Sequence, residues 1–172
     1  MRLYRSAVFV LAAITLAALP ARAQESKSVE VTPYLGFGTA GASPIGTAVT
    51  FPVSSTLSVE ADVAYRRAEG DINALSTSYS LLWSLPRAGR TTPYLAGGVG
   101  LAQYGAPVLF RGRPIATQTG LALTMNAGGG VTTAMNSRMD LRTDARWFKS
   151  FGKQGSDQFR VAQGISFGAG KQ

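Results

Sequence analysis

Two pairs of carboxylates are the residues of this sequence with the clearest potential for chemistry. Glu60 and Asp62 stand two positions apart, and Asp140 and Asp144 stand four positions apart. In an extended chain, even spacing places side chains on one face, so either pair could share a proton in general acid–base catalysis. Arginine shares the even spacing, however, as Arg142 shows between the two aspartates. We therefore interpret both pairs as parts of a salt-bridge network.

Other kinds of site are excluded by what the sequence lacks. The chain contains no histidine, so it has no Ser-His-acid triad, and no cysteine, so it has neither disulfides nor thiolate metal ligands. The glycine-rich stretches at 97–100 and 127–131 lie inside alternating segments rather than at a strand-to-helix turn, which argues against phosphate loops. No loop has the spacing of a calcium site. We expect no enzymatic activity, no cofactor and no metal.

The first 23 residues predict export. Arg2 and Arg5 precede an apolar run from Ala7 to Leu19, and the small residues Ala21 and Ala23 flank a cleavage site. We expect a signal peptide at residues 1–23 and a single domain at residues 24–172. The signal holds three of the seventeen basic residues and none of the nine acidic ones, so the remainder carries a net charge of +5. No basic run or basic patch with interleaved aromatics is present, and we expect no nucleic-acid partner.

The rest of the sequence alternates with a period of two, which is typical of β-strands. In the stretch from Met139 to Trp147, the even positions are charged and the odd positions are apolar or small. No apolar run after the signal approaches the length of a membrane-spanning helix. Eight alternating segments are predicted to be strands, at residues 29–38, 45–53, 57–67, 72–85, 93–104, 119–134, 139–148 and 159–168.

The connections between these segments predict an up-and-down meander. Three of them are short, at 54–56, 86–92 and 135–138, and they alternate with loops at 39–44, 68–71, 105–119 and 150–158. Eight such strands can close into an antiparallel barrel, which removes the exposed edges of the sheet. The fold class is therefore all-β, as an eight-stranded antiparallel up-and-down β-barrel preceded by a cleavable signal peptide.

Two barrels of opposite polarity fit this alternation. In a soluble lipocalin-like barrel the apolar face forms the core, whereas in a transmembrane β-barrel it faces lipid. The second is favoured because the polar face combines small residues with nearly balanced charge, as expected of a narrow interior. The charges expected to form this interior network are Glu30, Glu60, Asp62, Arg66, Asp140, Arg142, Asp144, Arg146 and Arg160.

Aromatic residues near the strand ends also favour the transmembrane barrel. Rings at the two rims of a barrel would lie at the two bilayer interfaces. The residues assigned to these rims are Phe51, Tyr65, Trp83, Tyr94, Tyr104, Trp147, Phe159 and Phe167.

The whole pattern resembles the small outer-membrane β-barrel family of the OmpA/OmpX type. The resemblance is most specific in PYLAGGVG at residues 93–100 and in AGGGVTTAMNSRMDLRTDARW at residues 127–147. It implies a location in the outer membrane of a Gram-negative envelope. It also implies an assembly signal in the last strand, here VAQGISF ending at the aromatic Phe167, which the outer-membrane assembly machinery would read.

The function expected is structural, in envelope integrity, or one of surface interaction, with no open channel. Outer-membrane lipid and lipopolysaccharide are the expected partners, and we expect a monomer. In the longest loop, Phe110, Arg111 and Arg113 are candidate surface contacts, since arginine pairs well with lipopolysaccharide phosphate. A narrow porin-like pore for small solutes and a soluble ligand-binding barrel remain as alternatives.

Overall fold

The structure is a computed structural model that describes residues 28–39, 43–68, 72–110, 113–152 and 157–169. The predicted signal peptide lies outside these ranges. No helix in the described ranges is long and apolar enough to cross a membrane. The strands are β1 (Val29–Gly38), β2 (Ile45–Pro52), β3 (Leu57–Ala68), β4 (Ile72–Ser84), β5 (Thr91–Phe110), β6 (Arg113–Ala134), β7 (Met139–Phe151) and β8 (Asp157–Ala169).

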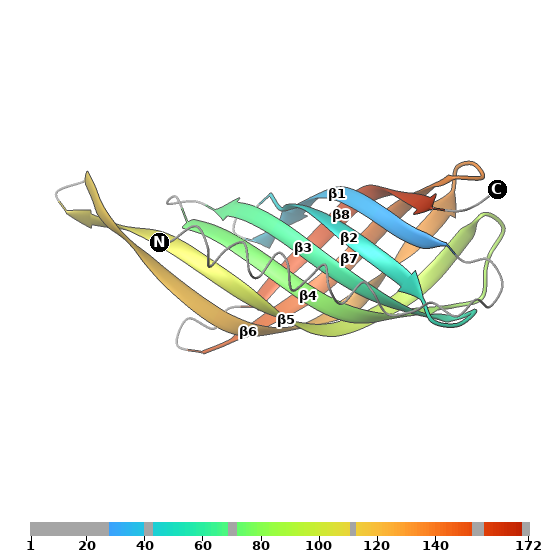
Figure 1. The fold of residues 1–172 in the computed structure, drawn as a ribbon, viewed down its shortest axis with the longest axis horizontal. Helices are drawn as coiled ribbons and strands as arrows, with labels where there is room; N and C mark the ends of the chain where they lie inside the picture. Colours follow the sequence, from blue (N-terminus) through green and yellow to red (C-terminus); the bar gives the residue numbers. More distant parts are fainter. Residues whose placement is uncertain (1–27, 40–42, 69–71, 111–112, 153–156, 170–172) are drawn as a thin grey trace.

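The eight strands form one closed barrel in sequence order (Figure 1). Each strand pairs in antiparallel fashion with its neighbours in the chain, and β1 closes the sheet by pairing with β8 from Val29↔Ala169 to Gly38↔Arg160. This arrangement confirms the predicted eight-stranded antiparallel meander. Closure gives every strand two partners over the body of the barrel, so the backbone polar groups there are satisfied within the sheet.

Tight turns mark one end of the barrel, which we call the turn end. The Ser54 side chain accepts a hydrogen bond from the backbone N–H of Leu57 at 3.0 Å, and the Asn136 side chain accepts one from Met139 at 2.9 Å. Short polar side chains stabilise turns in this way. Gly89, in the turn between β4 and β5, has a φ of 61°, a conformation that glycine adopts without strain. The predicted short connections therefore have a clear local cause.

At the opposite end, which we call the loop end, one prediction is wrong. Residues 105–119 were expected to form the longest loop, but β5 and β6 continue through most of this segment as a paired hairpin. The pairing extends to Phe110↔Arg113, with a shift in register between Val108 and Leu109. Two of the three candidate loop contacts, Phe110 and Arg113, therefore belong to strands. The third, Arg111, lies outside the described residues.

The two faces of the barrel differ sharply in polarity. Large apolar side chains stay exposed on the outside, with Leu35 66%, Leu81 55% and Val99 53% exposed. The buried positions alternate with them and hold charged residues, among them Glu60 and Arg146, each 1% exposed. Because a folded protein in water usually places its apolar residues inside, this polarity is the reverse of the usual one. Phe167, the aromatic residue of the predicted assembly signal, is on the outer face, 44% exposed.

Candidate functional site

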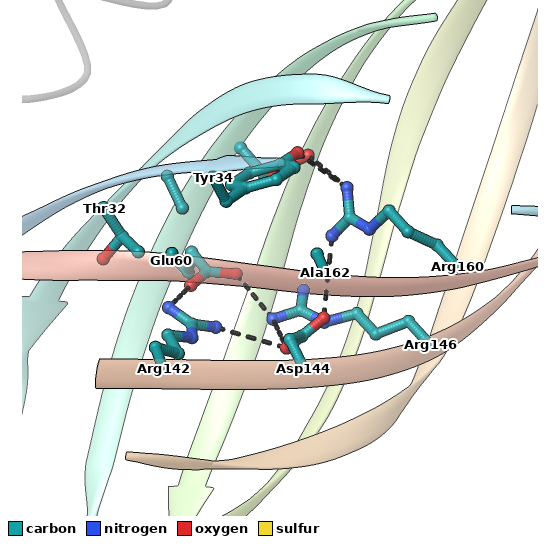
Figure 2. Close-up of a pocket in the computed structure, with 11 residues that line it drawn as sticks. Thr32, Tyr34, Glu60, Arg142, Asp144, Arg146, Arg160 and Ala162 are labelled. Atoms are coloured by element: carbon teal, nitrogen blue, oxygen red, sulfur yellow. Dashed lines mark hydrogen bonds and ion pairs between the residues drawn. The ribbon is translucent and has the colours of Figure 1, made fainter. Parts of the chain in front are cut away.

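The middle of the lumen is filled by a layer of six charged side chains, which we call the charged layer. Figure 2 labels Glu60, Arg142, Asp144, Arg146 and Arg160. All six are buried, and acids and bases are equal in number. Its members are Glu60, Asp62, Arg142, Asp144, Arg146 and Arg160. Alternation along β3, β7 and β8 turns these residues to one face. The layer is thus neutral when all six groups are ionised.

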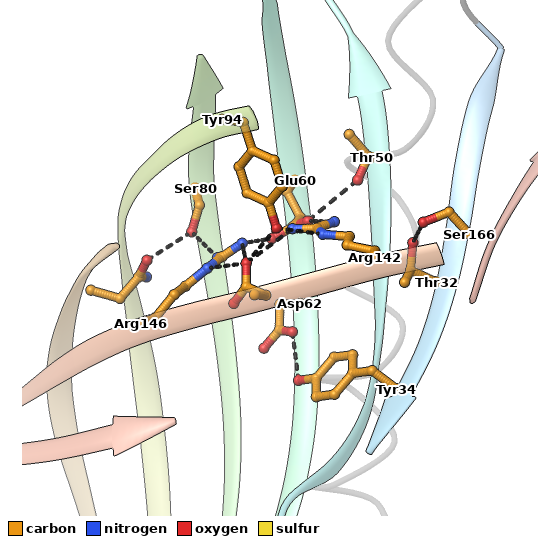
Figure 3. Close-up of polar contacts among 12 residues, drawn as sticks. Thr32, Tyr34, Thr50, Glu60, Asp62, Ser80, Tyr94, Arg142, Arg146 and Ser166 are labelled. Carbon is orange, nitrogen blue, oxygen red and sulfur yellow. Dashed lines mark hydrogen bonds and ion pairs between the residues drawn. The ribbon is translucent and has the colours of Figure 1, made fainter. Parts of the chain in front are cut away.

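Ion pairs within the charged layer cross the lumen. Glu60 on β3 forms ion pairs with Arg142 and Arg146 on β7, although these strands are not neighbours in the sheet (Figure 3). Arg146 Nη2 lies 2.7 Å from Glu60 Oε1 and 2.9 Å from Asp144 Oδ2. Because each arginine contacts two carboxylates, the layer is a network rather than a set of isolated pairs. It ties opposite walls of the barrel together.

Two tyrosines extend the network, and both make the same bonds. The Tyr34 hydroxyl accepts a hydrogen bond from Arg160 at 2.7 Å and donates one to Asp62 at 2.6 Å. The Tyr94 hydroxyl accepts from Arg142 and donates to Asp144, both at 2.7 Å. Each guanidinium also lies over the ring of its tyrosine, about 4.8–4.9 Å from the centroid.

The sequence interpretation missed these roles of tyrosine. Tyr94 was assigned to a rim, but it is 5% exposed inside the barrel. Tyr104 is also wrongly assigned, since its hydroxyl bonds to Ser150 at 2.8 Å and Arg66 lies over its ring. Their positions in the sequence could have identified both. Tyr94 and Tyr104 stand at even distances from Ala96, which faces inward, so all three belong to the same face of β5.

A glycine lies directly across the ladder from each tyrosine of the network. Tyr34 pairs with Gly46 on β2, and Tyr94 pairs with Gly130 on β6. A Cβ atom added to Gly130 would lie 2.5 Å from the Tyr94 hydroxyl oxygen. Glycine therefore provides the space in which each ring lies flat against the wall and reaches its charged partners.

Replacing Gly130 by alanine is expected to destabilise the barrel by about 1–3 kcal/mol, because the new methyl group would lie 2.3 Å from the Thr143 backbone oxygen and 2.5 Å from the Tyr94 hydroxyl, so that both the neighbouring strand and the ring must shift. Gly97→Ala is the matched control, since a Cβ atom there would meet only a backbone oxygen, at 3.8 Å. Urea unfolding of the detergent-refolded variants measures both changes. Equal effects of the two substitutions would contradict the role given to Gly130.

The remaining predicted network residues lie away from the charged layer. Glu30 and Asp140 are half-buried and line a cavity of about 580 Å³ at the turn end, together with Arg87 and Arg90. Arg66 lines a chamber at the loop end instead. The structure therefore distributes the nine predicted charges over three levels of the lumen.

The charged layer separates these two spaces. The cavity within the layer has a volume of about 20 Å³, room for about one water molecule. Its carboxylates are held by guanidinium groups, as described above, and the described residues contain no cluster of three or more His, Cys, Asp or Glu that could hold a metal. The geometry is that of a packed, ion-paired partition across the barrel.

Comparison with known proteins places this geometry in a structural class. No family model matches the sequence, and no curated protein matches it. Among solved structures, Neisserial surface protein A is 11% identical with a TM-score of 0.64, over 83% of this chain and 95% of that one. The N-terminal β-barrel domain of OprF from Pseudomonas aeruginosa is 17% identical with a TM-score of 0.57, over 84% and 100%. The outer membrane enzyme PagL is 12% identical with a TM-score of 0.54, over 81% and 99%.

The class is therefore the closed eight-stranded antiparallel β-barrel. Within it, the chain has the fold of the small outer-membrane β-barrels, which confirms at the level of the fold the resemblance to the OmpA/OmpX type. Identities of 11–17% define a common fold and no common function. One of the similar structures is an enzyme, so the fold alone does not decide between catalytic and non-catalytic roles.

Proposed function

We propose that this protein is a non-enzymatic outer-membrane β-barrel with a structural or surface-interaction role and a lumen closed to solutes. The observation that carries this proposal is the charged layer. Arg142, Arg146 and Glu60 join β7 to β3 across the lumen, and the cavity among them has room for about one water molecule. A barrel closed in this way resists deformation but offers no path to solutes.

The outer face of the barrel supports a location in the membrane. Its exposed side chains include Leu, Val and Met on the middle parts of the strands, among them Leu81, Val99 and Met125, whereas ion pairs occupy the centre of the lumen. Charges enclosed in ion pairs and apolar residues facing lipid are the arrangement expected of a transmembrane barrel. In the outer membrane the turn end would face the periplasm and the loop end would face outward, toward lipopolysaccharide. The outer-membrane assembly machinery is the proposed partner during insertion.

A non-enzymatic role is supported by the chemistry of the interior. The chain has no histidine to exchange protons near neutral pH. Glu60 and Asp62, the closest candidates for paired-carboxylate catalysis, point to different partners: Glu60 contacts two arginines, and Asp62 contacts Tyr34 and Arg160. These carboxylates already have cationic or hydroxyl partners, which suits a structural network better than a proton relay to substrate.

The closed lumen predicts that the refolded protein forms no steady single-channel steps in planar lipid bilayers. Aqueous channels belong to barrels of about 16 strands, and here the charged layer fills the narrower interior. Recording conductance across many insertions at neutral pH measures this directly. Steady steps of uniform size would favour the alternative, a narrow porin-like pore.

Two controls accompany the conductance recording: one shows that the protein is folded, and the other tests its location in the outer membrane. Cold and boiled samples run side by side on a denaturing gel must migrate differently, which shows that the inserted protein is a folded barrel. Fractionation of the cell envelope must then place the protein with the outer membrane. Recovery as a soluble protein without detergent would contradict the proposal and favour a soluble ligand-binding barrel.

A further inference from the structure

The chamber at the loop end has a composition that the structural role does not explain. Its volume is about 50 Å³, several times what one water molecule needs, so a group of a few non-hydrogen atoms fits. It lies on the loop side of the charged layer, and Arg160 forms part of both walls. Among the residues that the structure describes, two arginines and no carboxylate line it, and its other polar groups include Ser76, Tyr104 and Ser150.

This chamber contains two arginines, Arg66 and Arg160. The carboxylates of the charged layer pair with Arg160 and not with Arg66. The six charges of that layer balance among themselves, and Arg160 is already paired with Asp62 at 3.4 Å. Arg66 is half-buried; it donates a hydrogen bond to the side-chain oxygen of Gln158 and lies 5.7 Å from the centre of the Tyr104 ring. Within the part of the chain that the structure describes, no carboxylate pairs with it.

A half-buried guanidinium with only neutral partners favours the binding of an anion. Arginine presents a planar fork of N–H donors that matches the oxygens of a carboxylate or phosphate, and such charge-assisted bonds are about twice as strong as neutral ones. The hydroxyls of Tyr104 and Ser150, 2.8 Å apart, can each rotate to donate to the same ligand.

We propose that this chamber is a binding site for an oxyanion, with Arg66 as its main ligand. The phosphate group is the oxyanion that the outer face of a Gram-negative envelope offers in two forms, free in solution and on the lipopolysaccharide head group. The site depends on the barrel fold and on Arg66, and not on the closed lumen. Failure of this proposal would therefore leave the proposed structural role intact.

Titration of inorganic phosphate into the refolded chain in zwitterionic detergent at low ionic strength tests the site. Saturable binding is expected for the wild-type protein, and Arg66→Gln should weaken it by about tenfold or more, the loss expected for a charge-assisted hydrogen bond. Arg67→Gln is the matched control. It removes the same charge one position along β3, from an exposed side chain on the opposite face, and should leave the affinity unchanged.

A second variant and a second readout keep the test decisive. Arg66→Lys retains the charge without the fork and should bind with intermediate affinity, even if Arg66→Gln does not refold. In nanodiscs, the NMR signal of the Arg66 Nε–H group, assigned by its loss in Arg66→Lys, should shift on addition of free phosphate or with phosphorylated lipopolysaccharide. A shift in the first case identifies a diffusible anion, and a shift only in the second identifies the head group. No shift in either case, or equal losses in the Arg66 and Arg67 variants, would overturn the proposal.

Discussion

Replacing Glu60 by glutamine is expected to lower the free energy of unfolding by about 3–5 kcal/mol, the range for loss of one partner from a buried ion pair. Glu60 is 1% exposed and is paired with both Arg142 and Arg146. Glutamine has nearly the same shape, so no cavity contributes to the change. The variant leaves three buried arginines with two carboxylates, and Arg146, which is 1% exposed, loses the shorter of its two ion pairs. Urea unfolding in detergent, followed by tryptophan fluorescence, measures the effect.

The control for this prediction is Glu30→Gln. Glu30 also faces the lumen, but it is half-buried and borders the wide cavity at the turn end, where water screens its charge. Its loss should therefore cost about 1 kcal/mol or less. A cost at Glu60 no larger than that at Glu30 would show that the charged layer does not stabilise the barrel.

A double-mutant cycle measures the coupling energy between two members of the network, Glu60 and Arg146. Combining Glu60→Gln with Arg146→Met restores the balance of charge, so the double variant should be more stable than the sum of the two single losses predicts, by about 0.5–3 kcal/mol. Simple additivity would mean that the 2.7 Å contact between these side chains carries no net coupling.

Alternation was sufficient to predict the fold and the direction of the charges. Residues on β3, β7 and β8 keep a strict period of two, and a one-residue error would have placed Glu60 or Arg146 outside. The grouping of the charges could not be predicted in the same way. Whether Glu60 on β3 meets Arg142 on β7 or Arg160 on β8 depends on how far the strands are staggered around the barrel, and the sequence of one strand does not determine that stagger.

The tyrosines show where a compositional rule gave the wrong result. Aromatic residues near strand ends are commonly found at bilayer interfaces, and that rule placed Tyr94 at a rim. In the structure the Tyr94 ring lies inside the barrel instead, because Gly130, directly opposite, has no side chain and leaves space for the ring. The pairing of Tyr94 with Gly130 depends on the register between β5 and β6, which becomes visible only in the folded sheet.

The β5–β6 hairpin shows a second limit. Residues 105–119, predicted to be a loop, contain Pro107 and Pro114, and proline cannot donate a hydrogen bond to a central strand. In the structure both prolines lie beyond Asn73↔Gly105 and Leu123↔Phe151, the pairs at which the described contacts of β5 with β4 and of β6 with β7 end. Proline is compatible with a strand that has a partner on one side only. The hairpin can therefore continue past the barrel wall even though its composition is typical of a loop.

Replacing Val63 by arginine is expected to destabilise the protein in a lipid bilayer by about 2–4 kcal/mol, the cost of a cation near the bilayer midplane. Val63 lies at the middle of β3, is 41% exposed on the outer face, and pairs with Thr47 and Thr77. Val53→Arg is the matched control, since Val53 is 62% exposed in the tight turn after β2 and would lie at the membrane surface. There the same substitution should cost about 0–1 kcal/mol. Guanidinium-induced unfolding from lipid vesicles measures both. Equal costs at the two positions would mean that the outer face of the barrel does not meet lipid, because only a hydrocarbon layer makes the penalty depend on depth.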